Sequence, residues 1–299
     1  MKVLITGGGG FLGAWLIKRL KKRNVDVRVF DLKEDRSIVR EIIGDGADEI
    51  DWVSGDIADT EAVREAARGC TFAVHLAALL TPECSADPVL GAKVNLVGTL
   101  NVFEAAKAEG MTGVVYASSA SALAPDSCTD LSPITHYGAY KLAAEGCARA
   151  YWIESGIPSI GFRPAIVYGP GRVTGLTAGP SVACREALAG HPYTIGYSGG
   201  ADLIFVDDVA AVCEAAATRP FEGAHAVTLS GEMVDAGAIV EEIRKHVPEA
   251  ELDWNGPTLP IPAEMVPTPV EDLLGALPRT SLSEGIARTI AHYRSGREA

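Results

Sequence analysis

The stretch VLITGGGGFLG, which runs from Val3 to Gly13, decides how the rest of the chain is interpreted. An apolar run typical of a short buried strand leads directly into four glycines, and a helical pattern continues from Phe11 to about Leu20. A strand, a glycine-rich turn and a helix in this order place the amide groups of a helix N-terminus where they can bind phosphate. We therefore expect a nucleotide-binding site at this point of the chain.

The glycines satisfy two related spacings at once. Gly8, Gly10 and Gly13 read G-x-G-x-x-G, and Gly7 in place of Gly8 gives G-x-x-G-x-x-G. One glycine permits the tight turn, a second lets the backbone approach a pyrophosphate, and a third lets the helix pack closely on the strand. A glycine-rich turn without a ligand is the alternative. The residues expected to contact a dinucleotide here are Gly7, Gly10, Phe11, Leu12 and Gly13.

An acidic residue, Asp31, follows the next predicted strand, at 25–30. A carboxylate in this position accepts hydrogen bonds from the adenosine ribose and repels a 2′-phosphate, which favours NAD over NADP. Lys33 and Arg36 lie close behind and would favour NADP, and an ordinary turn residue is the alternative interpretation of Asp31. The expected cofactor is NAD.

Strand and helix patterns alternate through the first half of the chain. Such alternation implies right-handed crossovers and a parallel sheet with helices on both faces. The predicted fold class is α/β, with a Rossmann-type doubly wound parallel sheet. Beyond the elements named above, we expect strands at 51–54, 72–76, 113–117 and 159–162, helices at 60–68, 94–108 and 137–154, a strand end and helix at 204–217, and a final helix at 282–293.

The alternation ends near Pro164, after which glycine and proline become dense. We expect residues 1–165 to form an NAD-binding Rossmann domain, with a return segment at about 203–230. The segments 166–202 and 231–299 are expected to form a smaller C-terminal lobe that binds the substrate.

Composition and charge exclude several classes of protein. The chain has 299 residues and a formal net charge of −13, and its one basic cluster, at 18–23, lies at a helix end, so nucleic acid is not an expected partner. No apolar run approaches the ~20 residues of a membrane span, so no membrane contact is expected. The six cysteines are scattered without a metal-ligand spacing, so no metal is expected. These features favour a cytoplasmic location.

A tyrosine and a lysine share one face of the helix expected at 137–154. Tyr137 and Lys141 are four residues apart and form the chain's only Tyr-x-x-x-Lys. A nearby ammonium group and the cationic ring of an oxidised nicotinamide would both lower the pKa of a tyrosine from about 10, which suits it to general-base catalysis. A surface pair without a catalytic role is the alternative.

Hydroxyl groups follow the strand expected at 113–117, in the stretch from Ser118 to Ser121. The carboxyl ends of parallel strands are where such sheets bind ligands, so one of these hydroxyls could bind a substrate oxygen. Serine-rich strand ends also form ordinary turns.

Together these motifs resemble the extended short-chain dehydrogenase/reductase family, the NAD-dependent epimerase/dehydratase group. The resemblance implies an enzyme that transfers hydride with NAD on a Rossmann-type fold. It also implies a homodimer formed through the helices near 94–108 and 137–154. The matching stretches follow the family's order at 6–13, 55–57, 75–78, 95–99, 117–119, 137–141, 163–170 and 205–210.

The resemblance also implies roles for individual residues. Tyr137 would be the acid/base, Lys141 its tuner and a ribose ligand, and Ser119 the hydroxyl that orients the substrate. The other implied cofactor-binding residues are Asp56 and Ile57 at the adenine, Leu76, Ala77 and Ala78 along the cofactor, Asn95 holding the active-site helix, and Pro164 and Ile166 at the nicotinamide.

One position departs from the nucleotide-sugar members of the family. They carry an arginine that clamps the substrate phosphates, and this chain has Ala201 there. We therefore expect an NAD-dependent oxidoreductase that moves a hydride between the nicotinamide and a secondary hydroxyl or ketone of a small polar substrate: a sugar, sugar acid or hydroxy acid. Arg163, Arg172 or Arg185 could serve an anionic substrate.

Three alternatives stay open. The first is a nucleotide-sugar 4-epimerase or dehydratase that uses bound NAD. The second is a dinucleotide-binding protein without catalysis, although such relatives often lack the tyrosine or the lysine. The third is a reductase of an apolar substrate, because steroid- and flavonoid-type reductases share the Gly-Gly-Phe-Leu-Gly loop.

Overall fold

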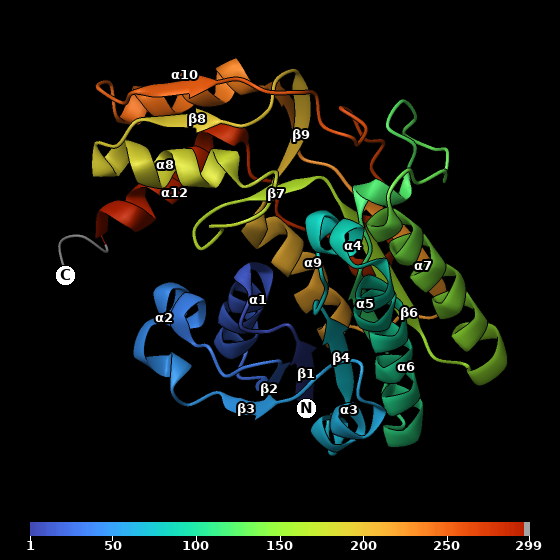
Figure 1. Ribbon diagram of the computed structural model, residues 1–299. Helices are drawn as coiled ribbons and strands as arrows, with labels where there is room; N and C mark the ends of the chain where they lie inside the picture. Colours follow the sequence, from blue (N-terminus) through green and yellow to red (C-terminus); the bar gives the residue numbers. More distant parts are fainter. Residues whose placement is uncertain (296–299) are drawn as a thin grey trace.

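The computed structural model describes residues 1–295, which are built around a parallel sheet of seven strands (Figure 1). The strand order is β10-β6-β5-β4-β1-β2-β3, so the order of the chain reverses between the neighbours β1 and β4. All pairings in this sheet are parallel, which confirms the predicted doubly wound fold. The strands are β1 (Lys2–Thr6), β2 (Asp26–Asp31), β3 (Asp51–Ser54), β4 (Phe72–His75), β5 (Val114–Ala117), β6 (Ser159–Pro164) and β10 (Ala224–Leu229).

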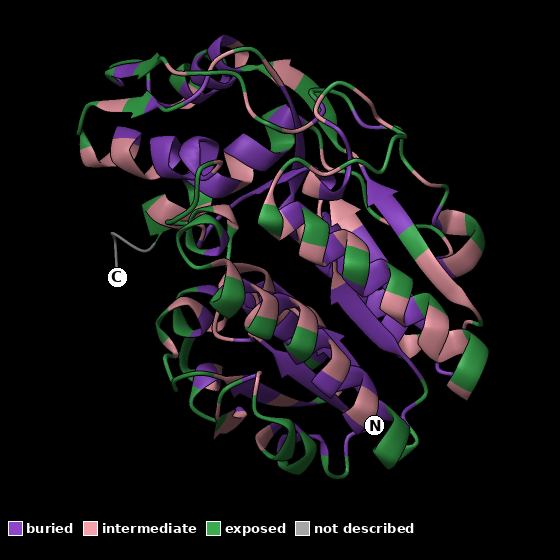
Figure 2. Cartoon of the chain, turned by 45° about the vertical axis from the view of Figure 1, so that its right-hand side comes forward, coloured by how far each residue is buried: buried purple, intermediate pink, exposed green. Residues whose placement is uncertain are grey.

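Helices cover both faces of this sheet. On one face α1 (Phe11–Lys22) packs against α9 (Val206–Thr218) and α2 (Ser37–Ile43). On the other face α6 (Gly98–Glu109) lies between α3 (Thr60–Ala67) and α7 (His136–Ser155). Figure 2 shows the strands buried between helices whose outward sides are exposed. The central strands β1, β4 and β5 are accordingly largely apolar and almost fully buried, as parallel sheets covered on both faces require, whereas β2, β3 and β10, at or next to the sheet edges, also carry polar residues.

A second group of elements packs beside the carboxyl edge of the main sheet (Figure 1). These segments include most of the predicted substrate lobe, although residues 296–299 at its end lie outside the described residues. The lobe boundaries themselves stay a prediction. The elements are β7 (Ile166–Tyr168), β9 (Gly200–Phe205) and β11 (Glu232–Asp235) in one sheet, β8 (Tyr193–Ile195) paired with β12 (Leu252–Trp254), and the helices α8 (Gly179–Ala189), α10 (Ala236–His246), α11 (Glu271–Leu274) and α12 (Leu282–Ser295).

The sequence pattern missed the helices α2, α8 and α10, several shorter elements and one strand of the main sheet. The strand β10 contains only six residues, two of them polar, so its pattern resembles a loop. The helix expected at 94–108 begins with a π-helical turn. This turn was not predictable from the sequence, because an apolar pattern does not distinguish a π turn from an α turn. The short helical elements are α4 (Thr81–Ala86), α5 (Pro88–Ala92), the π turn η2 (Lys93–Val97), and the 3₁₀ turns η1 (Gly44–Ala47) and η3 (Ala120–Ala122).

None of the helices within residues 1–295 has both the length and the apolar character needed to cross a membrane.

The turn between β1 and α1 allows a close approach of backbone to backbone. Gly7 has φ +70°, and a Cβ there would lie 2.6 Å from the Ala77 nitrogen. A Cβ at Gly13 would lie 2.6 Å from the Cα of Gly8. Each of these contacts is too short for any side chain, so the glycines are required by packing as well as by the turn.

Gly13→Ala is expected to lower the free energy of unfolding by about 1–3 kcal/mol, because the added methyl group must displace the backbone at Gly8. Gly46→Ala is the matched control, since a Cβ there meets nothing within 4 Å. Urea denaturation of both variants and the parent measures the difference. Equal midpoints for the two variants would contradict the close packing.

Candidate active site

A cavity of about 430 Å³ lies between the carboxyl edge of the main sheet and the second group of elements. It brings together residues predicted from distant parts of the sequence. The predicted residues that line it are Gly10, Phe11, Leu12, Leu76, Ala78, Ser119, Tyr137, Lys141, Pro164 and Ile166. The predicted residues outside its lining are Gly7, Gly13, Asp31, Asp56, Ile57, Ala77 and Asn95.

Tyr137 lies in the first turn of α7. The side chain of Thr135 caps this helix by accepting a hydrogen bond from the Gly138 amide at 3.0 Å. A Cβ at Gly138 would overlap the carbonyl of Ser121, so glycine lets the start of α7 press against the serine stretch after β5. This contact brings the start of α7 next to the serine stretch, and Tyr137 and Ser119 both line the cavity.

Lys141 follows one helical turn later and is only 2% exposed. Its Nζ donates a hydrogen bond to the Ala117 carbonyl at 2.7 Å and lies 5.5 Å from the centre of the Tyr137 ring. Burial lowers the pKa of Lys141 to about 8, and the nearby Cys84 thiol offsets this only in part. The lysine is therefore still charged at neutral pH, although at an energetic cost to the folded state.

The pKa of Tyr137 moves in the direction opposite to the one expected. Burial raises it above the ordinary value, whereas the Ser119 side chain and the charge of Arg172 lower the pKa in part. The tyrosine is therefore protonated at neutral pH in the protein alone. A further positive charge, such as that of an oxidised nicotinamide, is needed before it can act as a base.

The start of α1 fits a phosphate-bearing cofactor. Gly10 precedes the helix without a side chain that caps its first amides, so these amides are free to bind an anion. Gly10 lines the cavity, and a Cβ there would meet only the Gly7 carbonyl, at 3.3 Å, so the backbone at the start of this helix is open to a ligand.

Asp31 ends β2 beside the glycine turn. Its carboxylate accepts hydrogen bonds from the Gly9 amide at 3.0 Å and the Leu32 amide at 2.8 Å. Burial raises the pKa of Asp31, and these two amides oppose the shift. Arg36 is turned away, because it donates to the Ile50 carbonyl at 3.0 Å and lies over the Trp52 ring. The anionic group at this strand end thus favours NAD.

The remaining predicted cofactor residues contact the protein itself. Asn95 is fully buried behind the cavity, where it exchanges two hydrogen bonds with the Leu79 backbone at 2.8 and 2.9 Å. The Ile57 side chain lies in the core against Gly98, and the exposed Asp56 accepts a hydrogen bond from the Ala58 amide. The described contacts of Asn95 are thus those of a residue that positions the 76–80 loop.

Residues 3–231 match the model of the NAD dependent epimerase/dehydratase family. The chain belongs to this family. It is an NAD-dependent enzyme of the extended short-chain dehydrogenase/reductase type, as the sequence motifs predicted.

Two relatives and one solved structure illustrate the range of the family. UDP-glucose 4-epimerase of Mycolicibacterium smegmatis is 28% identical over 99% of each chain. Mitochondrial L-threonine 3-dehydrogenase of Sus scrofa is 28% identical over 85% of this chain and 70% of its own length. The structure of Thermus thermophilus UDP-glucose 4-epimerase in complex with NAD is 27% identical over 98% of this chain and 99% of its own, with a TM-score of 0.84.

A buried histidine in this family member links the glycine turn to α6. His75 Nδ1 and the Thr6 hydroxyl are 2.7 Å apart, and His75 Nε2 and the Thr99 hydroxyl are 3.0 Å apart. Thr99 in turn donates to the Asn95 carbonyl at 2.7 Å. Burial and the charge of Lys141 lower the pKa of His75 to about 3, so the histidine is neutral and serves to join these elements. The sequence pattern did not indicate this chain of contacts.

The structure separates the three arginines proposed for an anionic substrate. Arg163 is bound through two of its nitrogens to Glu145, and Arg185 forms an ion pair with Glu186 on α8. Arg172 alone of the three lines the cavity. The cavity wall also includes Leu259 to Ile261, in a proline-rich stretch whose sequence showed no periodic pattern.

Replacing the buried lysine should make the protein more stable at neutral pH. Below pH 8 Lys141 is charged in both the folded and unfolded states, and its burial costs up to about 3 kcal/mol. Between pH 8 and 10.5 the folded protein releases this proton before the unfolded chain does, so the stability of the parent rises with pH. We expect Lys141→Met to exceed the parent by about 1–3 kcal/mol at pH 7 and to lose this advantage by pH 10.5.

Unfolding free energies measured from pH 7 to 10.5 check this expectation. Lys107→Met, at an exposed position of α6, is the control and should track the parent throughout. A Lys141→Met advantage that stays constant with pH would show that charge burial is not its cause.

Asp31→Ser should weaken the discrimination against NADP by about 10- to 100-fold, because it removes the carboxylate that we expect to accept hydrogen bonds from the ribose hydroxyls and to repel a 2′-phosphate. Fluorescence titrations with NADH and NADPH give the two dissociation constants. Their ratio is the informative quantity, since distortion of the glycine turn would weaken both cofactors alike. Asp45→Ser, at an exposed position of η1, is the control, and an unchanged ratio in Asp31→Ser would exclude this role.

Proposed function

We propose that this enzyme oxidises a secondary hydroxyl of a small polar substrate with NAD, or reduces the corresponding ketone. The observation that supports this most directly is the shared cavity of Ser119, Tyr137 and Lys141, which also contains the residues of the glycine turn. A substrate in this cavity would lie beside all three side chains and next to the cofactor.

Each of the three side chains has a distinct task in this proposal. Ser119 donates a hydrogen bond to the substrate oxygen and keeps it next to Tyr137. Tyr137 takes the hydroxyl proton during oxidation and returns it during reduction. Lys141 holds a positive charge beside the tyrosine and donates to a ribose hydroxyl. The nicotinamide of the bound cofactor supplies or accepts the hydride.

The cofactor ligands are proposals of the same kind. The first amides of α1, after Gly10, would bind the pyrophosphate, and Asp31 would bind the adenosine ribose. Leu76 and Ala78 would lie along the cofactor, and Pro164 and Ile166 would border the nicotinamide. Asn95 would contribute indirectly, through the loop that it holds.

A small substrate is favoured over a nucleotide sugar by two features of the site. Ala201, at the position of the family's phosphate-clamping arginine, is buried within β9 and does not line the cavity. The cavity of about 430 Å³ also includes Pro164 and Ile166, which are expected to border the nicotinamide, so part of its volume is taken by the cofactor and the remainder suits a small substrate. Simple dehydrogenation of a sugar, sugar acid or hydroxy acid therefore fits better.

Nucleotide-sugar 4-epimerisation is the second candidate, supported by the full-length similarity to a UDP-glucose 4-epimerase. An epimerase keeps its cofactor and turns over a UDP-sugar without net formation of NADH. Turnover of UDP-glucose or UDP-galactose by the purified protein would favour this candidate over the first.

We also propose a homodimer in the cytoplasm. The helices α6 and α7 lie side by side on one face of the sheet. Apolar side chains are exposed there, Val97 just before α6 and Ile153 in α7. Light scattering distinguishes a dimer from a monomer.

The proposed cytoplasmic location is supported by the cysteines. All six are free thiols in the described part of the chain, which suits a reducing compartment.

Tyr137→Phe should reduce NADH formation by at least about 1,000-fold, because it removes the proton acceptor. The assay follows NADH absorbance with a panel of sugars, aldonates, uronates and hydroxy acids. Tyr140→Phe is the matched control on the same helix, since Tyr140 donates to the Pro88 carbonyl outside the cavity. Full activity of Tyr137→Phe would exclude the proposed mechanism.

A further inference from the structure

Arg172 is a cation without an anionic partner. Its guanidinium donates to the Val167 carbonyl and to the Thr177 hydroxyl, the latter at 2.6 Å. It also lies over the Phe11 ring, 6.0 Å from the ring centre. Among the ion pairs of residues 1–295, none includes Arg172. A guanidinium has five N–H donors, so several of them have no partner in these contacts.

The surroundings of Arg172 do not neutralise its charge. Burial lowers its pKa to about 10, and the nearby hydroxyls of Tyr137 and Tyr197 oppose the shift only weakly. The arginine is still charged at neutral pH. A charge held partly out of water without a counter-ion is unfavourable, and proteins rarely retain one without a ligand to pair with it.

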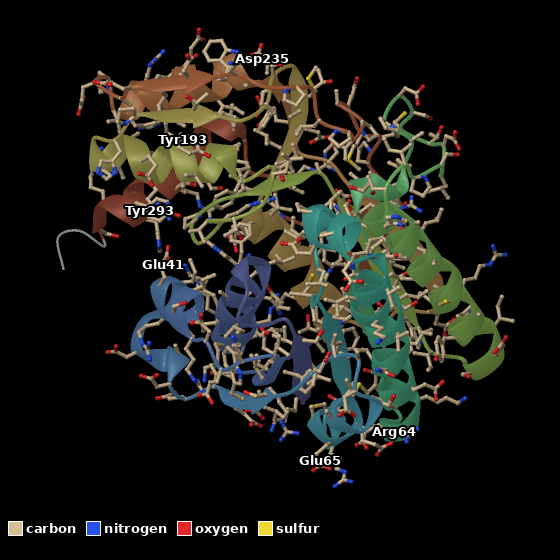
Figure 3. The ribbon with its side chains drawn as sticks, viewed as in Figure 1. Glu41, Arg64, Glu65, Tyr193, Asp235 and Tyr293 are labelled. Carbon is tan, nitrogen blue, oxygen red and sulfur yellow. The ribbon has the colours of Figure 1, made fainter. Side chains whose placement is uncertain are left out.

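The arginine is held in place by contacts on its own loop. The indole of Trp15 on α1 donates to the Pro170 carbonyl at 3.0 Å. The Gly171 amide donates to the Tyr293 hydroxyl on α12 at 3.1 Å. Tyr293 is labelled in Figure 3, at the boundary where α12 faces Glu41 of α2. The backbone next to Arg172 is therefore held by α1 on one side and by α12 on the other, and the position of the arginine side chain in the cavity wall is fixed accordingly.

The cavity around Arg172 selects for negative charge. Its described lining includes two cations, Lys141 and Arg172, and no aspartate or glutamate. One Lys141 donor is already used by the Ala117 carbonyl, so Arg172 has the larger number of free donors. The surrounding wall is largely apolar, from Leu80, Val173 and Leu176 to the 259–261 segment.

We propose that Arg172 binds a carboxylate of the substrate, so that the enzyme acts on short hydroxy acids. The planar fork of a guanidinium matches the two oxygens of a carboxylate. This inference rests on the proposed dehydrogenase function, because it assigns one end of the substrate while Ser119 and Tyr137 hold the other. The acid function is bound by Arg172, the reacting hydroxyl by the serine and tyrosine, and the short carbon chain by the apolar wall.

The first test compares acids with their uncharged amides. 3-Hydroxybutyrate is paired with 3-hydroxybutanamide and L-threonine with L-threoninamide, each oxidised to its ketone as NAD is reduced to NADH with release of a proton. We expect kcat/KM of the better acid to exceed that of its amide by at least about 30-fold, mainly through KM. Arg172→Gln should reduce this preference to near unity. Equal rates for acid and amide in the parent would overturn the inference and leave the dehydrogenase function intact.

A second measurement separates binding from turnover. In the Tyr137→Phe background, which does not turn over, thermal shifts are recorded for the NADH complex with acetoacetate and with acetoacetamide. A shift with the acid alone, lost in the Arg172→Gln double variant, supports the carboxylate site even if no alcohol of the panel is oxidised. A shift that survives Arg172→Gln overturns it.

Two controls and one further substrate distinguish a carboxylate site from a different role of Arg172. Arg185→Gln removes an arginine that is paired with Glu186 outside the cavity, and it should leave activity unchanged. NADH affinity should also be unchanged in Arg172→Gln, since a loss would mean that Arg172 binds a cofactor phosphate instead. sn-Glycerol 3-phosphate tests the other common anion, and a preference for it over the acids would overturn the assignment to a carboxylate.

Discussion

The backbone contact between Gly7 and Ala77 is the constraint on which the site depends. With a Cβ at Gly7 only 2.6 Å from the Ala77 nitrogen, no other residue lets the turn after β1 touch the segment after β4. These two strands are neighbours at the point where the strand order reverses, which is where doubly wound sheets bind their ligands. The contact brings the N-terminus of α1 next to the 76–80 loop. Asn95 then fixes that loop from behind, and the cavity forms in front of it.

The burial of charged side chains is a second property that shapes the site. Lys141 and Arg172 are both held where burial lowers their pKa, and the cavity provides no carboxylate to balance either of them. Burial shifts the pKa of Tyr137 in the opposite direction: it raises the pKa and keeps the tyrosine protonated. In the proposed reaction, the positive charge of an oxidised nicotinamide would lower the pKa of Tyr137, and a substrate carboxylate would pair with Arg172. The two proposals therefore assign opposite charges to the two ligands of the same cavity.

Much of the fold was predictable, because the pattern of buried strands and covering helices repeats along the first half of the chain. The ends of β3 and the start of α1 fall where the sequence pattern placed them. The gathering of Ser119, Tyr137 and Lys141 was predictable too, since strand ends and helix starts of a parallel sheet share one edge.

Other features depend on contacts between distant segments, which no local pattern encodes. The raised pKa of Tyr137 follows from its burial in the folded protein, and the sequence suggested only a nearby ammonium group. The sequence does not distinguish the three candidate arginines, Arg163, Arg172 and Arg185. Their contacts in the structure do, because two are paired with glutamates and only Arg172 lines the cavity. The 259–261 segment reaches the cavity through an irregular path, and irregular backbone has no periodicity to read.

The loop that holds Arg172 also bears on the order in which the protein matures. The glycine turn and its helix are made of neighbouring residues and can form early during synthesis. The hydrogen bond from the Gly171 amide, in contrast, cannot form until Tyr293 has been synthesised, 122 residues further along the chain. Domains generally fold as units, and a contact between distant segments forms only after both segments have been made. The loop that holds Arg172 therefore reaches its final position only after α12, near the end of the described chain, has been synthesised and has docked.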